Sequence, residues 1–285
     1  MTLRDHVGHP AAAPNGSDAM PGADSPLSAA VAARDSNILT LVRNAVAQRH
    51  VALAYQPVVM AARPDTIGFY EGLIRLMDPS GVVIPARDFI ETVEQHELGR
   101  QIDCLALEMG LLTLAANPGV RLSINMSARS IGYPRWIDTL RAGLAGDETL
   151  GERLILEITE SSAMVMPDIV SVFMRDLQCR GIAFALDDFG AGFTSFRYLR
   201  EFLFDIIKID GQFIRGIGAN ADNQVLVEAL RSIADHFDML TVAESVEDAV
   251  DAECCTRMGI SCLQGYFFGA PTLSPRWEDA ARLSA

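Results

Sequence analysis

The stretch VALAYQPVVMAARPDTIGFYEGLIRL, residues 51–76, contains two apolar runs, each of the length of a β-strand. The runs cover residues 51–60 and 67–76, and only AARPDT separates them. A parallel connection needs about a dozen residues or more, whereas an antiparallel hairpin closes with a short loop. The stretch therefore predicts two neighbouring antiparallel strands at the start of a sheet.

Six further strand-like runs follow this hairpin, and helical patterns such as MPDIVSVFMRDLQCRG lie between most of them. The runs are VRLSINM (120–126), RLILEIT (153–159), IAFALDD (182–188), DIIKID (205–210), MLTVAES (239–245) and SCLQGYF (261–267). Alternating strands and helices predict an α/β fold, a (β/α)8 TIM-like barrel with an antiparallel first strand. An open doubly wound sheet is the alternative, but no GxGxxG motif follows an early strand.

The N-terminal segment is rich in Ala, Pro, Gly, Ser and Asp and has almost no large apolar side chains. Such a segment buries too little surface to offset the entropy of ordering it. We therefore predict a disordered tail over residues 1–36 and one barrel domain over residues 37–285, beginning with a helix at 37–50. The sequence contains neither the apolar core of a secretory signal nor an apolar stretch long enough to span a membrane.

Charge and cysteine content exclude several classes of protein. The net charge of −14 argues against binding of duplex nucleic acid, which requires a basic face, but it is compatible with a small anion bound through metal ions. The five cysteines show no CxxC spacing, so they fit reduced thiols better than disulfides or a zinc site. Together with the missing signal, this pattern predicts a cytoplasmic protein.

Polar residues occupy the late positions of nearly every predicted strand. They are Asn125, Glu157, Asp187, Asp188, Lys208, Glu244 and Gln264, and Glu71 lies within the second strand. Because the carboxyl ends of barrel strands surround a common mouth, these side chains predict an active site there.

The residue types in this set indicate the chemistry. Two carboxylates ~4 Å apart repel by roughly 4 kcal/mol at an effective dielectric of about 20, so a cation should lie nearby. Oxygen ligands without Cys or His favour Mg²⁺ or Mn²⁺. The adjacent Asp187 and Asp188 favour two ions, an arrangement suited to in-line displacement at phosphorus.

Each of these residues also has a purely structural explanation. Asp187 and Asp188 could cap the glycine-containing turn that follows them, although a cap uses one carboxylate. Lys208 could neutralise Asp210 or a neighbouring strand. The remaining structural alternatives are an exposed turn for Glu157, a helix cap for Glu160 and backbone hydrogen bonding at the barrel rim for Gln264.

Eight segments carry a resemblance to a known family. They are YQPVV, YEGLIR, SINMS, LEITES, LDDFGAGFTSFRYL, IIKID, VAESVE and QGYFFGAP. With these segments in this order, the chain resembles the EAL-domain cyclic di-GMP phosphodiesterases over about residues 37–272. The resemblance implies hydrolysis of cyclic di-GMP to linear pGpG by a homodimer.

The resemblance also implies a role for each residue of the site. The expected ligands of a first metal ion are Glu71, Asn125, Glu157 and Asp187, and those of a second are Asp187, Asp188 and Glu244. The expected catalytic residues are Glu71, Lys208, which would position the attacking water, and Glu244, a candidate base. The expected substrate contacts are Gln56, Arg75 and Gln264, the last also supporting the metal or water shell. Glu160 would anchor the loop Gly190–Tyr198, which in the family connects the site to a dimer interface.

Three positions depart from the family pattern. Gly72 stands in place of Ala, Leu76 in place of Trp, and Ser245 in place of Gly. We expect Gly72 to loosen its strand slightly and Leu76 to remove an aromatic wall. None of the three is an expected metal ligand, so activity is still expected.

Two other functions fit parts of this pattern. A non-catalytic receptor for cyclic di-GMP would be marked by missing metal ligands, and none is missing. A Schiff-base aldolase also carries a lysine on a late barrel strand. That lysine needs a lowered pKa, which the surrounding carboxylates would raise.

Overall fold

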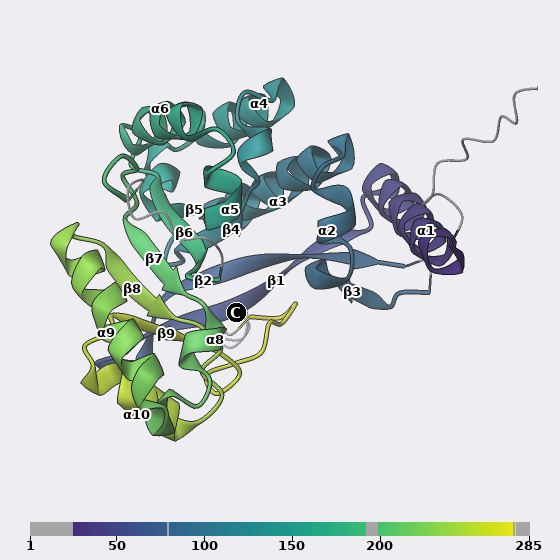
Figure 1. Ribbon diagram of the computed structural model, residues 1–285. Helices are drawn as coiled ribbons and strands as arrows, with labels where there is room; N and C mark the ends of the chain where they lie inside the picture. The colour runs from purple at the N-terminus through teal and green to yellow at the C-terminus, as the bar shows by residue number, and fades with distance from the viewer. Residues whose placement is uncertain (1–24, 79, 192–198, 276, 278–285) are drawn as a thin grey trace, which may run out of the picture.

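The computed structural model describes residues 25–78, 80–191, 199–275 and 277. Within them, nine strands form one sheet in the order β1-β9-β8-β7-β6-β5-β4-β2-β3, and β1 also pairs with β2. This last pairing closes the sheet into a barrel, from which only the short edge strand β3 (Val83–Pro85) is left out. The predicted TIM-like barrel is confirmed (Figure 1).

The barrel strands correspond closely to the predicted runs. They are β1 (Val51–Met60), β2 (Arg63–Met77), β4 (Leu122–Asn125), β5 (Leu154–Thr159), β6 (Ala183–Phe189), β7 (Ile206–Ile209), β8 (Leu240–Ala243) and β9 (Cys262–Gln264). Strand β1 is antiparallel to both of its neighbours, β2 and β9, which confirms the predicted hairpin. Strand β2 begins at Arg63 rather than at residue 67, because the turn consists of residues 61 and 62 and pairing continues into polar, exposed residues.

Helices surround the barrel (Figure 1). They are α1 (Pro26–Gln48), α2 (Ile90–Val93), α3 (Glu97–Ala116), α4 (Pro134–Leu144), α5 (Glu160–Ala163), α6 (Pro167–Gln178), α8 (Gly211–Ile214), α9 (Ala221–His236) and α10 (Ala249–Arg257). None of the helices in the described ranges combines the length and the apolar character needed to cross a bilayer.

Helix α1 begins earlier than predicted. Its first residue is Pro26, and the Ser25 side chain caps it by accepting a hydrogen bond from the amide of Ser28 at 3.0 Å. Residues 26–36, predicted to be disordered, are therefore helical in the structure. The prediction considered burial only, whereas this alanine-rich segment has high helix propensity and extends a helix whose later part, with Val42 and Ala45, is buried. Residues 1–24 lie outside the described part of the chain, and the division into tail and domain stays a prediction.

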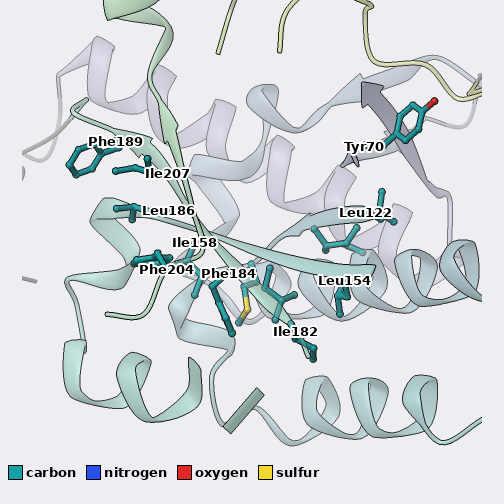
Figure 2. Packing of buried hydrophobic residues seen from close by; sticks show 14 of the residues in the cluster. Tyr70, Leu122, Leu154, Ile158, Ile182, Phe184, Leu186, Phe189, Phe204 and Ile207 are labelled. Carbon is teal, nitrogen blue, oxygen red and sulfur yellow. The ribbon is translucent and has the colours of Figure 1, made fainter. Parts of the chain in front are cut away.

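The outward faces of the strands form the main core with the surrounding helices. Figure 2 shows part of this packing, with Ile158 of β5 near Phe184 and Leu186 of β6. Phe184 and Leu186 are two residues apart on β6, so they point to the same face. Ala185, between them, points into the barrel.

Candidate active site

The interior of the barrel contains an apolar layer and, two positions further along each strand, a polar layer. The apolar layer consists of Val58, Phe69, Ile155, Ala185, Ile206, Val242 and Cys262. The polar layer consists of the residues two positions away on the same strands, Gln56, Glu71, Glu157, Asp187, Lys208, Glu244 and Gln264. On the parallel strands the polar residue follows the apolar one, so the polar layer lies at the carboxyl-terminal mouth.

Lys208 lies at the centre of the polar layer, with 1% of its side chain exposed. Its ammonium nitrogen, Nζ, is 2.8 Å from carboxylate oxygens of Glu157 and Asp187, 2.7 Å from Glu244 and 3.5 Å from Glu71. Burial alone would lower the pKa of Lys208, but the four carboxylates raise it well above its usual value. The lysine is therefore a cation and not a neutral Schiff-base nucleophile, which argues against an aldolase.

Two amide side chains orient Glu71. The Nε2 atom of Gln264 donates to Glu71 at 2.6 Å, and the Nδ2 atom of Asn125 donates at 2.8 Å. Burial alone would raise the pKa of Glu71, but Lys208 and these two donors bring it below its usual value. Glu71 is thus ionised and held in one orientation, so its carboxylate is suited to bind a cation.

Three carboxylates of the mouth, Glu157, Asp188 and Glu244, have a raised pKa and hold protons more tightly than usual. Burial, followed by the charge of Glu71, raises the pKa of Glu157 well above its usual value. Burial also raises the pKa of Glu244 to about 8 and, with the charge of Asp187, the pKa of Asp188 to about 6. One lysine is therefore insufficient to compensate all of these carboxylates, so the site favours additional cations.

A change in backbone conformation brings Asp187 and Asp188 to the same side. Consecutive residues of a regular strand point to opposite faces, and Asp188 would face away from the mouth. Asp188 instead has a φ of 54°, in the left-handed region, and the pairing with β7 is irregular between Leu186 and Phe189. As a result, Asp187, Asp188 and Glu244 each provide an oxygen, all within 4.8 Å of one another.

The donor set of this mouth fits divalent metal ions. The Oε1 atoms of Glu157 and Gln264 are buried and have no hydrogen-bond partner among the described residues. The remaining groups are carboxylate and amide oxygens, which Mg²⁺ and Mn²⁺ prefer over nitrogen or sulfur. The geometry therefore supports the metal-ligand set expected from the sequence.

The predicted substrate contacts lie at different places around the mouth. A cavity of about 230 Å³ is lined by Gln56, Glu71, Glu244 and Gln264, together with six further residues. Gln56 donates to the carbonyl of residue 269 at 3.1 Å. Arg75 is half-buried and is not among the residues lining this cavity in the described part of the chain.

Glu160 occupies the position expected of a loop anchor. Its Oε2 atom accepts a hydrogen bond from the amide of Gly190 at 3.4 Å. This contact connects the first turn of α5 to the end of β6. Residues 192–198 of the expected loop lie outside the described residues, so its connection to a dimer interface stays a prediction.

Three residues that line the cavity were not predicted from the sequence. They are Arg215, Glu247 and Tyr266. Each follows a barrel strand by a few residues, in the segments after β7, β8 and β9 respectively. Arg215 and Glu247 lie beyond the predicted strand runs, and Tyr266 lies within the run 261–267, of which only Gln264 was considered.

The structure changes the interpretation of two departures from the family pattern. A methyl group on Gly72 would lie 2.7 Å from Cδ1 of Ile124, so that side chain occupies the space an alanine would use. Leu76 is fully buried in the outer core and does not line the cavity, so the expected loss of an aromatic wall at the mouth is wrong. The expectation failed because residue 76 points to the opposite face from Glu71.

Comparison with known proteins gives one consistent family. The EAL domain model matches residues 41–271. The bifunctional diguanylate cyclase/cyclic di-GMP phosphodiesterase MucR of Pseudomonas aeruginosa is 31% identical over 81% of this chain and 34% of its own length. The cyclic di-GMP phosphodiesterase PdeB of Shewanella oneidensis is 30% identical over 81% of this chain and 27% of its own. The chain therefore spans about a third or less of these relatives.

A solved structure supports the same relationship. The PaMucR phosphodiesterase in complex with c-di-GMP has a TM-score of 0.72 and 29% identity, covering 83% of this chain and 97% of that one.

Proposed function

The chain belongs to the EAL domain family, and from this premise we propose that it hydrolyses cyclic di-GMP to linear pGpG with the aid of divalent metal ions. The observation that carries the proposal is the mouth of the barrel, where four carboxylates surround the buried Lys208, Asn125 donates to one of them and Asp188 lies beside two others. The relatives named as cyclic di-GMP phosphodiesterases support the substrate.

The proposal includes two ions, Mg²⁺ or Mn²⁺, in each site. The first would be bound by Glu71, Asn125, Glu157 and Asp187, and the second by Asp187, Asp188 and Glu244. Bound there, such ions supply positive charge that makes an attacking water more acidic and stabilises the charge developing on the phosphate.

The protein's own residues would orient the reacting groups. The Lys208 ammonium has three N–H donors, which here are directed at Glu157, Asp187 and Glu244, so it would donate to an attacking water once one of these carboxylates bound a metal ion instead. Glu244, whose carboxylate is 2.7 Å from the Lys208 ammonium, would be the candidate base that the family resemblance implies. Gln264 keeps Glu71 in place and closes one side of the cavity.

The proposal also includes a cytoplasmic homodimer that does not bind duplex nucleic acid. The dimer is implied by the family resemblance, and the net charge of −14 argues against a nucleic-acid partner. Sedimentation of the purified chain tests the dimer.

Turnover of the nucleotide is the decisive experiment. The protein is incubated with cyclic di-GMP and Mg²⁺ or Mn²⁺, and the nucleotides are separated by chromatography. We expect pGpG, and we expect its formation to stop with a chelator and in Glu71→Gln. Tight binding without turnover under either metal would instead identify a cyclic di-GMP receptor.

A further inference from the structure

Arg215 is a cationic side chain at the mouth of the barrel, and it is not among the metal ligands, catalytic residues or substrate contacts expected from the sequence. It is the C-cap residue of α8, after β7, and it lines the same cavity as Glu71 and Glu244. Its Nη2 atom donates to Oγ of Ser245 at 2.9 Å, and its Nε atom is 3.4 Å from Glu247. These contacts hold the guanidinium against the loop that follows Glu244.

Two neighbouring residues, Gly211 and Ser245, leave room for the Arg215 side chain and hold it in place. A methyl group on Gly211 would lie 2.6 Å from Cβ of Ser245 and 3.1 Å from Nη2 of Arg215, so glycine leaves the required space. Ser245 has a φ of 56°, a conformation that favours glycine, and its hydroxyl accepts the hydrogen bond from Arg215. Gly211, Ser245 and Arg215 therefore form one interdependent unit.

The charges around the cavity give Arg215 a specific use. Its acidic lining residues are Glu71, Glu244 and Glu247, and Arg215 is the cation among the described lining residues. Lys208 lies deeper and is engaged by four carboxylates. An anionic group that enters the cavity but does not lie at the metal-ligand set would therefore form its ion pair with Arg215.

A cyclic dinucleotide brings two phosphodiesters, of which one at a time can occupy the metal-ligand set. The other remains anionic and needs a partner within the same mouth. A guanidinium has five N–H donors, and the contacts to Ser245 and Glu247 use two of its three nitrogens. The outer nitrogen Nη1 is suited to a charge-assisted hydrogen bond with phosphate.

We infer that Arg215 binds the phosphodiester that is not cut and thereby selects substrates with two phosphates. This inference rests on the proposed function. The bond that breaks lies at the metal-ligand set, so Arg215 would contact the substrate away from the reacting atoms and would determine specificity. Ser245 and Glu247 keep the guanidinium at the mouth.

The test compares cyclic di-GMP with bis(p-nitrophenyl) phosphate, a diester that has no second phosphate. We expect Arg215→Ala to raise the KM for cyclic di-GMP by about 10- to 100-fold, as for loss of a hydrogen bond to a charged group. The ratio of kcat/KM for the two substrates should fall by the same factor. Arg215→Lys should recover part of it, and Arg141→Ala, which removes an exposed arginine of α4, should leave the ratio unchanged.

The outcomes separate this inference from the proposed function. An equal loss with both substrates would overturn it, because Arg215 would then act through the loop carrying Glu244. An unchanged ratio in Arg215→Ala would overturn it as well, while normal turnover by the wild type would leave the proposed function intact. If the wild type binds cyclic di-GMP without cleaving it, a calorimetric Kd that rises about 10-fold or more in Arg215→Ala supports the inference and an unchanged Kd overturns it. A wild type that neither binds nor cleaves the nucleotide overturns both.

Discussion

The two layers inside the barrel share the same strands and differ in what they contribute. The lower layer, with Ile155, Ala185 and Ile206, is apolar and packs tightly, as protein interiors normally do. The upper layer, with Glu157, Asp187 and Lys208 two positions further on, buries charges whose desolvation opposes folding. The lower layer stabilises the barrel, whereas the upper one is retained for its chemistry.

Because the two layers have different roles, a substitution in either layer should change mainly one property, activity or stability. Changes in the upper layer should remove activity with little loss of stability. Changes in the lower layer should remove stability with little loss of activity. Substitutions of Asp187 and Ile206 test this separation directly, and substitutions of Asp103 and Gly72, which lie outside both layers, should have smaller effects.

Asp187→Asn should remove most of the activity. It keeps the side-chain shape but removes a carboxylate expected to contact both metal ions. We expect kcat/KM for cyclic di-GMP to fall at least about 1000-fold. Mutating a residue that only hydrogen-bonds to a metal ligand already lowers metal affinity or activity about 10- to 100-fold, and the loss of a ligand itself should be larger. In chelator, the free energy of unfolding in urea should not fall. Asp138→Asn on the exposed face of α4 is the control, and more than a tenth of wild-type activity in Asp187→Asn would contradict the assignment.

Ile206→Ala should have the opposite effect. It opens a cavity in the apolar layer, and we expect the free energy of unfolding to fall by about 2 to 4 kcal/mol. Turnover per folded molecule, measured well below the unfolding transition, should change less than about threefold. Leu240→Ala, at an exposed position on β8, is the matched control and should cost much less. Equal losses at the two positions would argue against a packed lower layer.

Asp103→Asn tests the cost of a buried carboxylate away from the mouth. Burial raises the pKa of Asp103 to about 6, although Ser130 and the amide of Ser127 donate to it, and the charge of Glu94 raises it further. The folded state therefore binds this proton more tightly than the unfolded state. The resulting stability is fully present below the unfolded pKa of about 4 and is lost as the pH rises through about 6.

Between pH 4 and pH 7 this group should remove on the order of 2 kcal/mol from the free energy of unfolding. The difference in stability between wild type and Asp103→Asn, measured in urea with chelator, should shift by that amount in favour of the variant at higher pH. A difference that is constant with pH would show that Asp103 does not titrate in this range.

Gly72→Ala should have the smallest effect. The added methyl points away from the mouth and meets the flexible end of Ile124, so we expect a change below about 1 kcal/mol in stability and below about threefold in kcat/KM. A loss of activity without a loss of stability would show that residue 72 influences the mouth despite facing outward. Gly265→Ala is the contrasting variant, because its methyl would collide with the backbone of Val246.

Much of this arrangement could be predicted from the sequence because the side chains of a strand alternate with a period of two. That rule, with the short hairpin connection, was sufficient for the barrel and for the positions of Glu157, Lys208 and Gln264. The rule could not predict that both Asp187 and Asp188 face the mouth, since this depends on a left-handed residue. The sequence analysis placed both at the site because both end the same apolar run, although strict alternation would direct Asp188 away from the mouth.

Other features depend on contacts between segments distant in sequence. Arg215 and Glu247 reach the cavity because the loops after β7 and β8 fold back over the mouth, which no single strand pattern reveals. The early start of α1 depends on helix propensity rather than on burial. The place of Leu76 follows from alternation alone, and the resemblance misled the prediction there.

The hydrogen bonds of Gln264 have a consequence for the order in which the molecule assembles. Gln264 on β9 bonds to Gln56 and Glu71, partners that precede it in the chain by 208 and 193 residues. Closing so long a loop is slow relative to forming the β1–β2 hairpin. During synthesis the hairpin can form early, but the side of the site that Gln264 provides exists only after the last strand has left the ribosome. The polar layer is thus completed at the end of folding, together with the closure of the barrel.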